Sequence, residues 1–227
     1  MSDCFCHFNG YEVKDSFARR HIENKQNPHG VTAAQVGAAP AGYGLGEGAT
    51  AIDSWANAVR NGYYRSSYDT PDGNGNGWHG IVVSYSTELC NQLVWKTWDA
   101  GTLMATRRLY NGVAEPWEWL NPPMIPGVEY RTTERYNGNP VYTQLVEFGS
   151  LPASTYKDKQ FTTDYVTNVV KINAICMYDG IVRNVEEISG VTDLSVQRSS
   201  KMSIVRIQTN TDLSARTAYV ELKYTKD

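Results

Sequence analysis

The 227-residue sequence lacks the features of several large protein classes. Only 20% of its residues are charged and its formal net charge is −3, so it lacks the basic surface that nucleic-acid binding requires. No apolar run approaches the roughly 18 residues that span a membrane. The N-terminus has neither the basic nor the apolar segment of a secretory signal. These absences favour a globular protein, folded in the cytoplasm, without nucleic-acid binding or membrane insertion.

Cysteine is sparse, and none of the four cysteines (Cys4, Cys6, Cys90 and Cys176) stands in a C-x-x-C pair. Cys4, Cys6 and His7 could together hold a metal ion, but no second pair of ligands follows at the spacing usual for zinc. We therefore expect an exposed N-terminal tail there, and no metal or cofactor in the protein. So few cysteines in a long chain also argue against a disulfide framework.

The common catalytic motifs are missing as well. There is no G-x-S-x-G, no H-E-x-x-H and no P-loop. A G-x-G-x-x-A match at residues 44–49 lacks the apolar strand that precedes a dinucleotide-binding turn. Glu115 and Glu118 flank Trp117, and two carboxylates beside tryptophans would suit a glycosidase. The same residues also suit the aromatic end of a strand. We therefore expect that the protein is not an enzyme.

Three regions differ in composition, and the first covers residues 1–40. Val13, Phe17 and Ile22 predict an apolar stripe on a short helix. Such a helix is marginal alone, so it needs a partner, which could be another copy of the chain. His29 follows a proline in the next turn. Three copies on an axis could ligate a metal there, but such a histidine more often caps a turn or packs between chains.

The second region, residues 41–124, contains all six tryptophans. It predicts a short helix at 52–60 with Asp53 near its cap, a glycine-rich loop at 70–77, and strands at 80–86, 92–98 and 102–110. Together these favour a small antiparallel β unit with an aromatic core. Trp78 and His79 follow the loop. An exposed tryptophan there could stack on a sugar ring, whereas a Trp78 that begins a strand would belong to the core.

The third region, residues 125–227, has no tryptophan and no proline after Pro152. Asn137-Gly138 and Asp179-Gly180 each predict a tight hairpin turn. In the last apolar segment, alternation places Ala218, Val220, Leu222 and Tyr224 on one face and Tyr219, Glu221 and Lys223 on the other. Several short strands in about 100 residues favour a β-sandwich or jelly roll.

Several segments, taken in order, resemble tail proteins of bacteriophages and pyocins. The segment NPHGVTAAQVGA (27–38) resembles a short motif of phage tail fibres and tail spikes. A second set resembles the knob module of pyocin-type tail fibres: residues 51–64, 80–86 and 116–124, with Gln92 and Arg107. Residues 126–152 resemble the start of the C-terminal head in tail proteins of Gram-positive phages. The chain is short for a full fibre, so the resemblance indicates a compact receptor-binding protein or a short distal tail protein.

The resemblance implies a homotrimer on the virion tail, with an N-terminus attached to the tail or baseplate and a head that faces a host-surface glycan. The expected fold is mainly β: a short N-terminal helix, an antiparallel β knob and a β-sandwich or jelly-roll head, in an intertwined homotrimer. Val13, Phe17, Ile22 and His29 would line the trimer axis. The receptor-binding tip would be either the Asp179-Gly180 turn or the 70–79 loop, and the candidate residues are Tyr178, Asp179, Arg183, Trp78 and His79.

Two other functions fit the same residues. One is a structural baseplate or collar protein that has no host ligand. The other is a depolymerase of surface polysaccharide, which would use Glu115 and Glu118.

Overall fold

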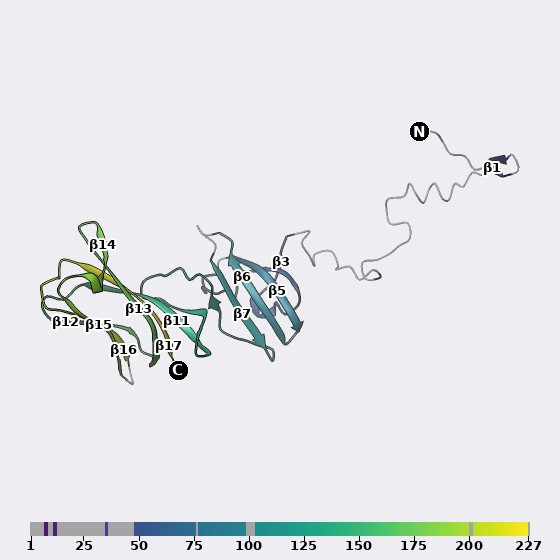
Figure 1. The fold of residues 1–227 in the computed structure, drawn as a ribbon. Helices are drawn as coiled ribbons and strands as arrows, with labels where there is room; N and C mark the ends of the chain where they lie inside the picture. The colour runs from purple at the N-terminus through teal and green to yellow at the C-terminus, as the bar shows by residue number, and fades with distance from the viewer. Residues whose placement is uncertain are drawn as a thin grey trace. The chain divides into compact units, whose positions relative to one another are not determined.

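The computed structural model describes residues 7–8, 11–12, 35, 48–75, 77–98, 103–199 and 202–226. The chain divides into two compact units, Met1–Gly48 and Ala49–Asp227 (Figure 1). In the first unit, strands β1 (His7–Phe8) and β2 (Tyr11–Glu12) pair antiparallel.

The predicted trimer-axis residues lie outside the described part of the chain. They are Val13, Phe17, Ile22 and His29. Cys4 and Cys6 also lie outside it. The N-terminal helix, its apolar stripe and the homotrimer therefore stay predictions.

Most strands of the second unit belong to one 12-stranded sheet with the order β14-β13-β17-β11-β10-β9-β7-β6-β5-β4-β3, and β8 pairs with β7 beside this path. We call residues 49–124 the aromatic module and residues 125–226 the C-terminal module. The strands of the aromatic module are β3 (Thr50–Ala51), β4 (Gly62–Ser66), β5 (Trp78–Ser86), β6 (Leu89–Lys96), β7 (Met104–Tyr110), β8 (Val113–Ala114) and β9 (Glu118–Trp119). The three strands predicted for this region are confirmed, with slightly different ends.

Side chains from one face of this sheet form an aromatic core. Trp78 has no exposed surface, and its ring meets Trp119 edge to face at 5.8 Å between centroids. Val82, Val94 and Leu109 are buried beside these rings. The apolar face of a small sheet has to be covered, and large aromatic rings bury much surface for few residues.

The predicted helix at 52–60 is wrong in length and type. Only η1 (Trp55–Asn57), a single 3-10 turn, is present. Its N-cap is Ser54, whose Oγ accepts from the Ala56 N–H at 3.2 Å, and Asp53 directly precedes this cap as predicted.

A buried polar network binds the end of this turn. The side chain of Gln92 has no exposed surface, and its Nε2 donates to the carbonyls of Trp55 and Ala58 at 2.7 and 2.9 Å. Its Oε1 accepts from Arg107 Nε at 2.8 Å. The Arg107 guanidinium also donates to both carboxylate oxygens of Asp69, at 3.2 and 2.6 Å. A side chain from β6 therefore binds two carbonyls of this segment, one of which, that of Trp55, also accepts the Ala58 N–H of η1 at 3.1 Å.

The C-terminal module has two layers (Figure 1). The larger layer continues the sheet with β10, β11, β17, β13 and β14, and a three-stranded sheet of β12, β16 and β15 forms the other. A 3-10 turn, η2 (Val185–Glu187), follows β14. The strand bounds are β10 (Glu129–Tyr136), β11 (Asn139–Ser150), β12 (Tyr156–Thr162), β13 (Val166–Tyr178), β14 (Ile181–Asn184), β15 (Val191–Ser199), β16 (Met202–Thr209) and β17 (Thr217–Lys226).

A second core lies between these two layers. Val205 and Ile207 of β16 are fully buried together with Phe148 of β11 and Leu222 of β17. The alternation predicted for the last strand is confirmed, because its inward set is buried: Ala218, Val220, Leu222 and Tyr224. Two layers of unequal size agree with a sandwich rather than with the paired four-stranded sheets of a jelly roll.

Two-residue turns set the register of the hairpins. Asn137 and Gly138, between β10 and β11, have φ of 50° and 81°. Asp179 and Gly180, between β13 and β14, have φ of 49° and 73°. Positive φ at both central residues is the signature of a type I′ turn, whose twist matches that of the strands. Both predicted hairpins are confirmed.

Candidate functional site

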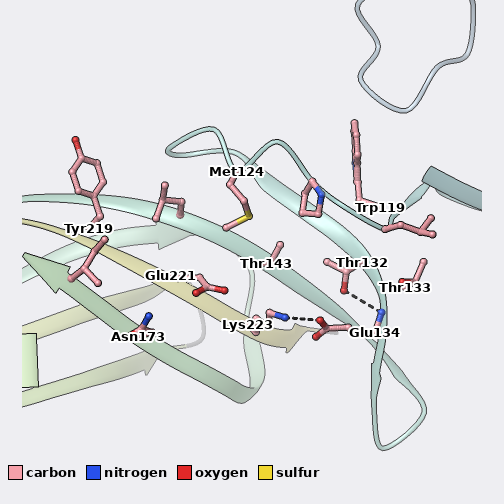
Figure 2. A pocket seen from close by; sticks show the side chains of 14 residues that line it. Trp119, Met124, Thr132, Thr133, Glu134, Thr143, Asn173, Tyr219, Glu221 and Lys223 are labelled. Carbon is pink, nitrogen blue, oxygen red and sulfur yellow. Dashed lines mark hydrogen bonds and ion pairs between the residues drawn. The ribbon is translucent and has the colours of Figure 1, made fainter. Parts of the chain in front are cut away.

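A groove with a volume of about 490 Å³ lies on the outer face of the large sheet, beside segment 119–124 (Figure 2). Ligand sites typically have volumes of about 300–1,000 Å³. Four strands supply the floor, so the side chains are held by rigid backbone. We call this site the sheet groove, and its residues are Trp119, Leu120, Pro122, Met124, Thr132, Thr133, Glu134, Thr143, Leu145, Asn173, Ile175, Tyr219, Glu221 and Lys223.

Strand register brings distant parts of the sequence together on this floor. Glu221 of β17 lies between Leu145 of β11 and Asn173 of β13, which are its Cα partners on either side. Tyr219 is paired with Ile175 in the same way. All of them stand on the face opposite the buried core, because successive residues of a strand point to opposite faces.

The charges of the sheet groove balance. Lys223 Nζ binds Glu134, an ion pair that Figure 2 draws as a dashed line. Glu221 pairs with Lys171 of β13 at 2.9 Å. Each acid therefore has its own lysine, and the groove offers hydrogen-bonding groups without a net charge.

Apolar surface completes the sheet groove. Tyr219 and Trp119 stand at opposite ends of the view in Figure 2, and Tyr219 is half-buried. Leu120 and Ile175 are exposed large apolar residues. A ring with one apolar face and several hydroxyl groups could contact the tyrosine and these aliphatic side chains, while Asn173 and the exposed Thr133 meet its hydroxyls.

Trp78, a predicted receptor-binding residue, is not available to a ligand. It is fully buried, and its Nε1 donates to Asp72 Oδ1 at 3.1 Å. The prediction is therefore corrected in favour of the alternative, in which Trp78 begins a strand and belongs to the core. The cause is the glycine-rich loop, which folds back so that Asp72 binds the indole N–H.

His79 lies next to it but on the outer face of β5, outside the sheet groove. Its Nδ1 lies 2.9 Å from Thr97 Oγ1, and its ring meets Trp95 edge to face at 5.1 Å. Burial lowers the pKa of His79, so the imidazole is neutral at neutral pH.

The other predicted tip residues are exposed on the β13–β14 hairpin, away from the residues of the sheet groove. The guanidinium of Arg216 lies 4.7 Å from the centroid of the Tyr178 ring. Asp179 forms the turn and Arg183 follows on β14, both exposed. Their role in receptor binding stays a prediction.

The carboxylates that would serve a glycosidase are both bound by arginines. Glu115 Oε1 accepts from Arg108 at the surface. Glu118 accepts from Arg131 at 2.9 Å and, with both oxygens, from Arg135 at 2.7 and 2.8 Å. This arrangement ties β9 to β10, which is a structural role.

Within residues 7–8, 11–12, 35, 48–75, 77–98, 103–199 and 202–226, no group of three or more His, Cys, Asp or Glu residues is placed to hold a metal ion. Cys90 and Cys176 are buried and free, and burial raises the pKa of the Cys90 thiol. Among the described helices, none has the length and apolar character to cross a bilayer.

The sequence does not identify the residues of the sheet groove as a site, although the alternating pattern of the last strand indicates some of them. Alternation had already assigned Tyr219, Glu221 and Lys223 to the outer face of their strand. It could not show which other strands would lie beside them, nor that segment 119–124 would border the same face.

Comparison with known proteins finds no matching family model and no matching curated protein. Among solved structures, the R1 pyocin fibre of P. aeruginosa matches with 11% sequence identity and a TM-score of 0.25, over 77% of this chain and 66% of that one. An N-truncated R2-type pyocin tail fibre matches with 10% identity and a TM-score of 0.28, over 79% of this chain and 99% of that one. This chain thus spans just under two thirds of the R1 fibre fragment. At these values the similarity assigns neither a family nor a function.

Proposed function

We propose that this protein is a tail-fibre receptor-binding protein that reads a neutral saccharide on the host surface through its sheet groove. The observation that carries the proposal is the groove itself, in which aromatic, aliphatic, amide and hydroxyl groups are held without net charge on four strands. Weak binding per site would suffice, because several copies on one particle raise avidity by roughly 10²–10⁴.

The tail location rests on the sequence resemblance. Residues 27–38, 51–64 and 126–152 follow the order of tail-fibre segments, which supports attachment to a tail or baseplate through the N-terminus and a homotrimeric assembly. The protein acts without catalysis, a proposal that the arginine contacts of Glu115 and Glu118 support.

Tyr219→Ala should weaken binding of the full chain to its saccharide by about tenfold or more, a loss near 1.4 kcal/mol, because the ring loses its apolar contact. The measurement is binding of the purified chain to a panel of bacterial surface polysaccharides. Tyr85→Ala is the matched control, since that tyrosine is 91% exposed on β5 and outside the groove.

Two results would contradict this function. If the wild-type chain binds none of the polysaccharides, the structural baseplate role replaces it. If the chain releases oligosaccharide products and Glu118→Gln stops their release, the protein is a depolymerase.

The homotrimer is tested by light scattering on the full chain. We expect a mass three times that of the 25.4 kDa chain, because the short apolar helix predicted for residues 1–40 needs partners. A monomer would contradict the fibre assembly.

A further inference from the structure

A second cavity, of about 340 Å³, lies in the aromatic module. It lies between β4, β5 and the end of β6, and none of its residues belongs to the sheet groove. We call it the aromatic pocket, and the residues that matter here are Arg65, Tyr68, Gly77, His79, Thr97 and Trp98.

Two large aromatic side chains of this pocket are open to solvent. Trp98 is 76% exposed and Tyr68 is 69% exposed, whereas Trp78, which also lines the cavity, is in the core. Exposed aromatic faces beside a cavity are the usual means of binding a flat, partly apolar ring.

The Trp98 ring is held in place by the backbone beneath it. A Cβ atom at Gly77 would lie only 2.8 Å from Trp98 Cζ3, so the ring packs directly on the glycine. The N–H of Thr97 donates to the carbonyl of Gly77 at 3.0 Å, which fixes the preceding residue. A ring that is already ordered loses little conformational freedom when a ligand binds.

The polar groups of the pocket give it a positive charge. Arg65 of β4 and His79 of β5 are register partners on the outer face of the sheet. Within the described part of the chain, Arg65 has no ion-pair partner, and none of the residues that line the pocket is an acid. His79, whose pKa burial lowers, contributes a neutral ring that can donate or accept a hydrogen bond.

We propose that the aromatic pocket binds a sugar ring that carries an acidic group, either a carboxylate or a phosphate ester. The ring stacks on Trp98 and Tyr68, and the acid binds Arg65, whose guanidinium pairs well with such planar or tetrahedral anions. His79 and Thr97 hydrogen-bond hydroxyl groups. This site stands independently of the sheet groove, whose charges balance and which we expect to prefer a neutral ligand.

A nucleic-acid strand fits less well, although a base could also stack on Trp98. One arginine can pair with a single negative charge, whereas binding along a nucleic-acid strand needs a row of cations. The formal net charge of −3 also opposes a polyanion.

The experiment titrates the full chain by calorimetry with a glucuronic-acid-containing disaccharide, its glucose counterpart and glucose 6-phosphate. At least one acidic probe should bind ten times or more tightly than its neutral counterpart. Trp98→Ala should weaken that binding tenfold or more, while Trp98→Phe, which keeps a ring, retains most of it. Arg65→Gln should lower the affinity for the acidic probe to that for the neutral one.

Two matched variants control for general effects. Tyr85→Ala removes an exposed aromatic ring from another part of β5, and Arg60→Gln removes an exposed arginine that does not line the pocket. Both should leave all affinities unchanged. The proposal is overturned if neutral and acidic probes bind equally, if no probe binds, if Arg65→Gln has no effect on the acidic probe, or if a dinucleotide binds more tightly than the sugars.

Discussion

Arg107→Ala should lower the free energy of unfolding of the aromatic module by about 2–4 kcal/mol. The side chain of Arg107 is only 4% exposed, and it joins two otherwise separate groups, the Gln92 amide and the Asp69 carboxylate. Its guanidinium also lies 4.2 Å from the centroid of the Trp117 ring. Alanine would leave Gln92 Oε1 buried without its donor, which alone costs about 1–3 kcal/mol, and would remove the contact with the indole.

The measurement is chemical denaturation followed by tryptophan fluorescence, which reports the aromatic module alone because all six tryptophans lie between residues 55 and 119. Arg108→Ala is the neighbouring control. Arg108 pairs with Glu115 at the surface, where water and salt weaken an ion pair, so its removal should change the free energy of unfolding far less. Equal losses for both variants would show that the buried network does not stabilise the module.

Asp72→Ala should also destabilise the aromatic module, by about 2–3 kcal/mol, because one carboxylate organises the glycine-rich loop. Asp72 Oδ1 accepts from the Trp78 indole at 3.1 Å and from the Thr70 hydroxyl at 3.0 Å, and Oδ2 pairs with Lys96 at 2.9 Å. The side chain of Lys96 is 7% exposed, so the ion pair is largely shielded from water. Asp53→Ala is the control, since Asp53 is exposed and does not cap η1.

The Asp72 carboxylate should also make the free energy of unfolding of the aromatic module depend on pH in the acid range. Burial raises the pKa of Asp72. Hydrogen bonds from Lys96, from the backbone N–H of Asn74 and from Thr70, together with the charge of Lys96, lower the pKa by more, so it lies below its ordinary value. Its contribution is therefore complete above the unfolded pKa of about 3.9 and is lost as the pH falls through the lower folded value. The stability difference between wild type and Asp72→Ala should shrink in that acid range, and a constant difference would contradict this role.

Local rules predicted the parts of the fold that depend on neighbouring residues. Asp179-Gly180 and Asn137-Gly138 fix their turns by backbone preference alone, and the last strand alternates because one face is buried. The position of Trp78 depended on Asp72 reaching back to its indole N–H, which residue type and spacing do not show. The carbonyls at the end of η1 are bound by Gln92, more than thirty residues away, a contact that local sequence does not show.

The two proposed binding sites were harder to predict, because each is assembled from segments far apart in the chain. The sheet groove combines Trp119 with Tyr219, and the aromatic pocket combines Arg65 with Trp98. Single side chains in these sets carry no distinctive sequence pattern. Their function depends on register and on which residues remain exposed.

The two-residue strand β9 determines how the protein would respond to tension. Trp119 belongs to the aromatic core and also meets Tyr130 of β10 at 5.6 Å between ring centroids, while β9 pairs with β7 on one side and β10 on the other. So few interstrand hydrogen bonds make β9 a weak link, and its release would draw Trp119 out of the aromatic core. Release of β9 would free residues 120–128, each extending by up to about 3.5 Å. In the tail-fibre role that we propose, tension would lengthen the chain at this joint and dismantle the sheet groove, which Leu120 and Met124 line. The aromatic pocket would keep its shape, because none of its residues belongs to segment 119–128.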